Sequence, residues 1–174
     1  GRPDAEARAL VRHAEGADLP EAIVRHARAA ARQDILVYAN QDAVGHFDMA
    51  LAALARLPDE AATRRLRLET LLGLRDPLFR LGDIARIRTC LAEAAALAAR
   101  LEDPVGIAQA AILSSHAHWM AGDPVAAKVD ADRAAALAAS SDDAALALRA
   151  QFQLGLTHLA TGALVDAALV MGQV

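Results

Sequence analysis

Apolar residues recur three and four positions apart along almost the whole chain, and short polar breaks separate the stretches that carry this pattern. Such spacing places the apolar side chains on one face of an α-helix. Strand-like runs are confined to short pieces such as Ile35-Leu36-Val37. The pattern therefore predicts an all-α fold of about nine helices, in which Pro77 kinks the last turns of the fourth. The helices are predicted over residues 4–15, 20–38, 41–56, 59–81, 83–101, 104–121, 124–139, 142–161 and 163–172.

Three of the polar breaks contain a glycine, and successive glycines are 40 residues apart. They are Gly82, Gly122 and Gly162. Five positions after each glycine stands a residue that we expect to face a neighbouring helix; these residues are Ile87, Ala127 and Ala167. A fixed period of this size is the sequence signature of a repeat architecture built from helix pairs.

Small residues seven positions apart lie on one stripe of a helix, where they let a second helix approach closely. The predicted stripes are Ile87 with Ala94, Ala127 with Ala134, Ala43 with Ala50 (and Phe47 between them), and Ala22 with Ala29. At least four helix pairs are therefore expected.

These repeats predict one domain over residues 1–174. The helix pairs are expected over approximately 4–38, 41–81, 83–121 and 124–161, with 163–174 starting the next pair. Because the chain starts abruptly at Gly1 and reaches Val174 without a helix stop signal after Gly172, we expect it to be a piece of a longer multidomain protein.

The last predicted pair reads Leu154-Gly155-x-x-His158-x-x-x-Gly162-x-x-x-x-Ala167, and this spacing resembles the tetratricopeptide (TPR) consensus. His158 takes the place of the usual tyrosine, and the period is 40 residues rather than about 34. The resemblance implies a right-handed superhelix of antiparallel helix pairs, an α-solenoid, in which the first helix of each pair lines the concave face.

Longer phrases resemble a specific group of bacterial signalling proteins, which join a class III nucleotide cyclase domain to an AAA-type ATPase and C-terminal TPR repeats. The phrases are Leu74-Arg75-Asp76-Pro77-Leu78-Phe79-Arg80-Leu81-Gly82-Asp83, Leu91-Ala92-Glu93-Ala94-Ala95-Ala96-Leu97-Ala98, His118-Trp119-Met120-Ala121-Gly122-Asp123 and Gln153-Leu154-Gly155. Residues 20–58 look like the helices that precede that region. Related arrays occur in ATPase-linked transcription regulators of the LuxR and MalT type, so a parent of that kind stays open.

The repeat register, combined with this resemblance, assigns a set of side chains to the concave face. The set comprises Glu69, Leu72, Asp76 and Phe79, then Gln109, Ile112, His116 and Trp119, then Arg149, Phe152 and Leu156. Aromatic anchors mixed with charges are typical of surfaces that bind proteins. We therefore expect a non-catalytic scaffold or regulatory segment that binds a protein or a neighbouring domain of its own parent.

Two alternatives stay open. Trp119 and Phe152 are equally suited to fill gaps between adjacent helix pairs. A small-molecule-sensing domain, with a metabolite held around His116, Trp119 and Arg149, is the alternative function. Self-association through exposed end helices is a further expectation for a repeat array.

Composition and charge narrow the classes of partner. Hydrophobic residues make up 55% of the chain and aromatic residues only 3%, as closely packed alanine- and leucine-rich helices require. A net charge of -4 argues against nucleic-acid binding. The arginines at 64, 65 and 67 are flanked by Glu60 and Glu69, which indicates a solvated helix face. No apolar run is long enough to suggest a membrane span, so a cytoplasmic location is expected.

Residues that carry chemistry are sparse, and none has the spacing of a known site. Lys128 is the only lysine and lies outside any phosphate-binding loop. His116 and His118 are two positions apart on a helix and diverge, which disfavours a metal site. Ser114 and Ser115 lie near His118 without an oxyanion hole. Cys90 is expected to be a packed residue, and no cofactor, metal or catalytic residue is predicted.

Overall fold

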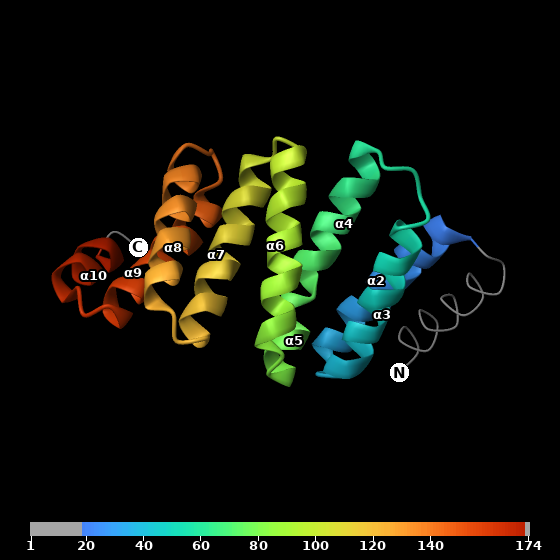
Figure 1. Ribbon diagram of the computed structural model, residues 1–174, viewed down its shortest axis with the longest axis horizontal. Helices are drawn as coiled ribbons and strands as arrows, with labels where there is room; N and C mark the ends of the chain where they lie inside the picture. The colour runs from blue at the N-terminus through green and yellow to red at the C-terminus, as the bar shows by residue number, and fades with distance from the viewer. Residues whose placement is uncertain (1–18, 173–174) are drawn as a thin grey trace. The chain divides into compact units, whose positions relative to one another are not determined.

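The computed structural model describes residues 19–172, which form helices joined by short turns, with no strand among them (Figure 1). The all-α prediction is therefore confirmed. The helices are α2 (Pro20–Leu36), α3 (Asn40–Leu54), α4 (Ala61–Gly73), α5 (Arg75–Leu81), α6 (Ile84–Arg100), α7 (Pro104–Met120), α8 (Pro124–Ala139), α9 (Ala144–Ala160) and α10 (Leu164–Met171). The helix predicted over residues 4–15 lies outside the described residues.

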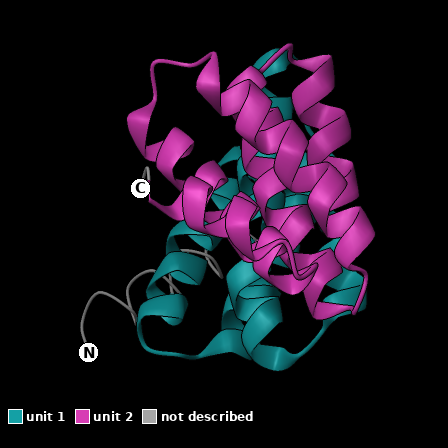
Figure 2. Cartoon of the chain, turned by 90° about the vertical axis from the view of Figure 1, so that its left-hand side faces the viewer, with its two compact units in different colours: residues 1–90 teal, residues 91–174 magenta. Residues whose placement is uncertain are grey.

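Contacts divide the chain into two compact units, Gly1–Cys90 and Leu91–Val174 (Figure 2). The boundary falls inside α6, a continuous helix. The single domain over residues 1–174 and the superhelix that would run through it stay predictions. Each unit is described by itself below.

The three glycines of the 40-residue period end their helices in the same way. Gly82, Gly122 and Gly162 have φ angles of 76°, 77° and 78°, a left-handed conformation that costs glycine little. In each turn the glycine N–H donates to the carbonyl three residues back, at 3.0–3.2 Å. The next N–H donates to the carbonyl five residues back, at 2.9–3.0 Å. This is the Schellman motif, and it makes the 40-residue period a repeated turn geometry.

Substitution by alanine should have opposite effects at two glycines, one in a left-handed turn and one inside a helix. Gly122→Ala should lower the free energy of unfolding by about 1 kcal/mol, because a Cβ disfavours the left-handed backbone. Gly45→Ala should raise it by about 1 kcal/mol, because Gly45 is exposed within α3 and a Cβ there meets no atom within 4 Å. Urea denaturation of both variants checks this pair. Equal shifts of the same sign would contradict the assigned turn geometry.

Aspartates cap four successive helices, and they are spaced 20 residues apart. They are Asp83, Asp103, Asp123 and Asp143. Each carboxylate Oδ1 accepts a hydrogen bond, 3.0 Å long, from the backbone N–H three residues further on. The caps satisfy N–H groups that have no partner within the helix. Each 40-residue repeat is thus two helices of nearly equal length, both started by an aspartate.

The next position of this series is Ala163, which begins α10 without a side-chain hydrogen bond. Ala163→Asp should therefore raise the free energy of unfolding by about 1 kcal/mol, because the new carboxylate restores the missing cap. Thermal denaturation followed by circular dichroism measures the change. Ala136→Asp, at an exposed position inside α8, is the control and should give no gain, since aspartate is a poor residue for a helix interior.

One predicted helix is two helices in the structure. The sequence pattern predicted a single helix over residues 59–81 with a kink near Pro77, but α4 ends at Gly73 and α5 begins at Arg75. Pro77 has no N–H to donate to the carbonyl of Gly73, so the helical hydrogen-bond series is interrupted one turn earlier than predicted. Gly73 also lies against Phe47: a Cβ added to it would be 2.9 Å from the ring Cζ.

The core of unit 1 confirms one predicted stripe and corrects another. Ala43, Phe47 and Ala50 of α3 are buried as predicted. In α2 the predicted stripe is wrong, because Ala29 is exposed and Ala22 only half-buried. The buried face of α2 is shifted by about one residue, because the bulkier Ile23 and Val24 set its centre. The buried residues on that face are Ile23, Val24, Ala27, Ala30 and Ala31.

Alanine dominates the core of unit 2, where α7, α8, α9 and α10 pack as neighbours (Figure 1). The predicted packing residues Ala127, Ala134 and Ala167 are at most 1% exposed. One cluster joins three helices and comprises Ala108, Ala111 and Ile112 of α7, Ala134 and Ala138 of α8, and Leu146 and Ala150 of α9. On α6, Ala94 of unit 2 and Ile87 of unit 1 are each buried, as predicted.

Candidate interaction surface

Large apolar side chains are exposed at one position of three successive repeats. Phe79, Trp119 and Leu159 each stand three residues before the glycine of the turn, and they are 36%, 43% and 46% exposed. Their carbonyl groups accept the glycine N–H of the Schellman motif, so the turn fixes their backbone. We call Trp119 and Leu159, which both belong to unit 2, the turn-end pair. Phe79 holds the same repeat position in unit 1.

The ring of His116, also on α7, lies beside the indole of Trp119. The ring centroids of His116 and Trp119 are 5.7 Å apart and the planes are tilted by 45°. His116 is half-buried, while Trp119 is 43% exposed. An exposed indole held by a neighbouring ring is a pre-organised apolar anchor, because little side-chain freedom remains to be lost on binding.

Phe152 was predicted on the same face as Trp119, but its repeat counterpart points to a different role. Forty residues earlier stands Ile112, which is only 6% exposed within the cluster that joins α7, α8 and α9. Phe152 is 51% exposed. On α7 this repeat position packs against neighbouring helices, whereas on α9 it is open among the described residues. Gln109, half-buried, and Arg149, exposed, are also 40 residues apart and hold equivalent positions on α7 and α9.

The candidate residues of unit 1 are engaged in contacts within the chain. Glu69 of α4 accepts a hydrogen bond of 2.5 Å from Nη2 of Arg28, a nearly buried arginine of α2. Asp76 pairs with the adjacent Arg75 at 2.7 Å. The Arg75 guanidinium also lies over the ring of Phe79, 4.8 Å from its centroid. Glu69 and Asp76 thus form ion pairs within the chain, and exposed pairs of this kind contribute little to stability.

Ser115 and His118, two of the groups that the sequence analysis weighed for catalysis, contact residues of neighbouring helices. Ser115 is buried, and its Oγ accepts a hydrogen bond of 3.1 Å from Nε2 of Gln153, which joins α7 to α9. Nε2 of His118 lies 3.6 Å from Oδ2 of Asp130 on α8. Burial raises the pKa of Asp130 above its usual range, and His118 and Arg133 offset part of this rise.

Unit 1 holds a further acid–base pair that sequence spacing did not reveal. Nδ1 of His46 lies 2.6 Å from Oδ2 of Asp34, whose side chain is 2% exposed. The pair fastens α3 to α2. Among residues 19–172 no three histidine, cysteine or acidic side chains are grouped as a metal site would require. Within the same range no helix combines the length and the apolar content needed to cross a bilayer.

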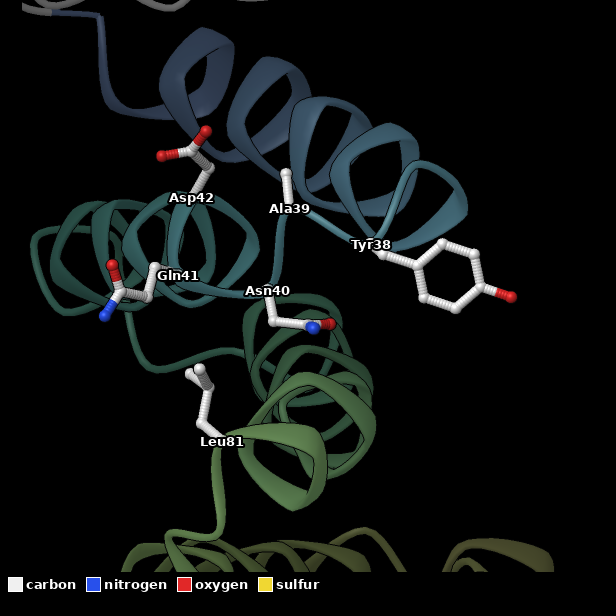
Figure 3. Close-up of a pocket in the computed structure, with 6 residues that line it drawn as sticks. All are labelled: Tyr38, Ala39, Asn40, Gln41, Asp42 and Leu81. Atoms are coloured by element: carbon white, nitrogen blue, oxygen red, sulfur yellow. The ribbon is translucent and has the colours of Figure 1, made fainter.

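A small cleft of about 340 Å³ opens where the α2–α3 turn faces the end of α5. Asn40 and Leu81 point toward it, whereas Tyr38 points away (Figure 3). The guanidinium of Arg80 lies 4.7 Å from the centroid of the Tyr38 ring and so links the turn to α5. The metabolite pocket of the alternative function would lie elsewhere, in unit 2 around His116, Trp119 and Arg149, and stays a prediction.

One exposed residue of this surface escaped the sequence interpretation. Leu159 stands 40 residues after Trp119, so the period alone was a sufficient signal.

Comparison of the chain with protein-family models and with curated proteins finds no match.

Proposed function

We propose that the chain is a non-catalytic, TPR-like interaction segment, which binds a protein or a neighbouring domain through the turn-end pair Trp119 and Leu159 and the ring of His116. The observation that carries the proposal is the exposure of large apolar side chains at one repeat position, 43% for Trp119 and 46% for Leu159. Core packing does not require these side chains at this position. Exposed aromatic and aliphatic anchors are the residues that dominate binding energy at protein interfaces.

The parent of such a segment would be a bacterial signalling protein, as the resemblance to cyclase–ATPase proteins suggests. An α-solenoid suits this role, since stacked helix pairs offer an extended surface and transmit a partner's binding as a change of curvature. Consecutive helices joined by Schellman turns at a fixed period support this reading. A partner in the same cytoplasmic compartment is the expected ligand.

The test is affinity capture from a lysate of the source cells with three baits. The first is the wild-type chain, and the second carries Trp119→Ser and Leu159→Ser. The third carries Val125→Ser and Val129→Ser, a matched control because these valines of α8 are 73% and 64% exposed. We expect a protein that the wild type and the control retain and the second bait loses. Identical retention by all three baits would overturn the proposal.

A metabolite panel with a thermal-shift readout separates the small-molecule alternative. A ligand at about 100 times its dissociation constant adds about 2.7 kcal/mol of stability. We expect that no metabolite will raise the melting temperature of the wild type while leaving that of the Arg149→Ala variant unchanged. A metabolite that gives this pattern would replace the protein-binding proposal with a sensor.

A further inference from the structure

Two aromatic rings of unit 1 are exposed among residues 19–90, and each is paired with an arginine of the same chain. The guanidinium of Arg75 lies 4.8 Å from the centroid of the Phe79 ring. That of Arg80 lies 4.7 Å from the centroid of the Tyr38 ring. A cation within about 6 Å of a ring centroid is attracted to the face of the ring. The chain thus shows which group its own exposed rings bind.

Trp119 holds the repeat position of Phe79 but lacks such a cation. Arg75 stands four residues before Phe79, and the equivalent position on α7 is Ser115. Ser115 is 0% exposed and accepts a hydrogen bond from Gln153. No guanidinium or ammonium group of residues 19–172 lies over the indole. Because an indole attracts cations more strongly than a phenyl ring does, the exposed Trp119 can bind a cation that a partner supplies.

An exposed carboxylate follows the turn after each member of the turn-end pair. Asp123 comes directly after the glycine that follows Trp119, and Asp166 lies in the first turn of α10, seven residues after Leu159. Oδ1 of Asp123 accepts the capping hydrogen bond from the N–H of Ala126. Neither carboxylate forms an ion pair with another described residue. Both are therefore available to a positively charged partner.

Unit 2 is acidic overall. Residues 91–172 contain four basic and nine acidic side chains, whereas residues 19–90 contain eleven and nine. Nζ of Lys128 in unit 2 is paired with Oδ2 of Asp132 at 2.7 Å. Arg149 lies in the first half of α9, whereas Leu159 is next to its last residue. Complementary charge speeds association and disfavours wrong partners, so this surface favours a basic partner.

We propose that the turn-end pair binds an arginine-bearing segment of a partner protein. A guanidinium of the segment lies over the indole of Trp119, an apolar side chain packs on Leu159, and Asp123 and Asp166 attract the positive charge. Arginine fits this site better than lysine, because its planar guanidinium stacks on aromatic rings and is more weakly hydrated. The inference rests on the proposed function and names the chemistry of its partner.

Selection of random short peptides displayed on phage identifies the preferred chemistry. The wild-type chain is the bait, and peptides that also bind the folded Trp119→Ser, Leu159→Ser variant are discarded. We expect the remaining peptides to contain arginine about threefold or more above the starting library, beside an apolar residue. Enrichment of acidic residues, or of apolar residues alone, would overturn this inference and leave the proposed function standing. Absence of any peptide that depends on the pair would contradict both.

The fluorescence of Trp119 then tests the contact with the cation. Trp119 is the only tryptophan of the chain, so its emission reports binding at this site. A selected peptide is compared with its counterpart that carries citrulline, a neutral analogue of arginine. Citrulline should weaken binding by about fivefold or more, because the attraction to the ring and to the carboxylates is lost. Equal affinities of the two peptides would overturn the inference.

Paired substitutions of aspartate test the two carboxylates. Asp123→Asn with Asp166→Asn should weaken binding of the arginine peptide by about fivefold, because two attractive charges are lost. The fold should persist, since asparagine caps a helix as well as aspartate does.

Asp142→Asn with Asp143→Asn is the matched control, because it removes the same charge and also replaces one helix cap. These residues lie at the start of α9, about 25 Å from its other end. At physiological salt the Debye length is about 8 Å, so this variant should bind like the wild type. Equal weakening by both pairs of substitutions, or none by Asp123→Asn with Asp166→Asn, would overturn the inference.

Discussion

Replacing Phe47 with alanine should lower the free energy of unfolding by about 3–5 kcal/mol, the range for a fully packed aromatic side chain. Phe47 is 3% exposed on α3, and its ring lies against Gly73 at the end of α4. The substitution leaves a cavity beside the α4–α5 break, where Pro77 already interrupts the helical hydrogen bonds. Urea denaturation of wild type and variant measures the loss.

A double-mutant cycle with Gly73 tests whether the ring contact is the cause. Gly73→Ala alone should destabilise the protein, since its Cβ would lie 2.9 Å from Cζ of Phe47. In the Phe47→Ala background the same substitution should be harmless or favourable, because the clash is gone and alanine is the better helix former. Additive effects of the two substitutions would contradict the packing described for this break.

Ala134→Leu should lower the free energy of unfolding by about 1–3 kcal/mol through overpacking. Ala134 is 0% exposed in the cluster between α7, α8 and α9, where the helices approach closely on alanine. Three added carbon atoms would push α8 away from Leu146 and Ala150. Thermal denaturation of the purified variant gives the change.

Ala136→Leu is the matched control for this substitution. It lies on the same helix, two residues away, and its side chain is exposed. The same added volume should therefore leave stability nearly unchanged. Equal melting temperatures for the two variants would show that α8 does not present Ala134 to the core.

The repeat could be predicted from sequence because its signals are local. A glycine that ends a helix needs a left-handed backbone, so Gly82, Gly122 and Gly162 marked the turns correctly. The apolar residues five positions later were buried as expected, since a helix that starts at a fixed point presents a fixed face.

The two errors in the fold have different causes. The break between α4 and α5 involves Phe47, which is far from Gly73 in the sequence. The face of α2 was misjudged by about one residue because small residues alone were counted, while Ile23 and Val24 bury more surface.

The candidate surface combines local signals with contacts between distant residues. Trp119 and Phe79 were assigned to the concave face; both are exposed, and the assignment itself stays a prediction. The hydrogen bond between Arg28 and Glu69 joins residues of different helices that no local pattern connects. Leu159 could have been identified from the 40-residue period, because it stands 40 residues after Trp119. The role of Phe152 required the burial of its counterpart Ile112, which only the packing of α7 against α9 reveals.

Site-specific photo-crosslinking tests the central claim most directly. Benzoylphenylalanine is placed at position 119, at position 159 or, as a control, at the exposed position 136 of α8. The three chains are irradiated in lysate of the source cells. The account predicts an adduct of higher mass with the same protein from positions 119 and 159 and none from position 136. Adducts from position 136 alone, or none from positions 119 and 159, would contradict the claim that the turn-end pair binds a protein.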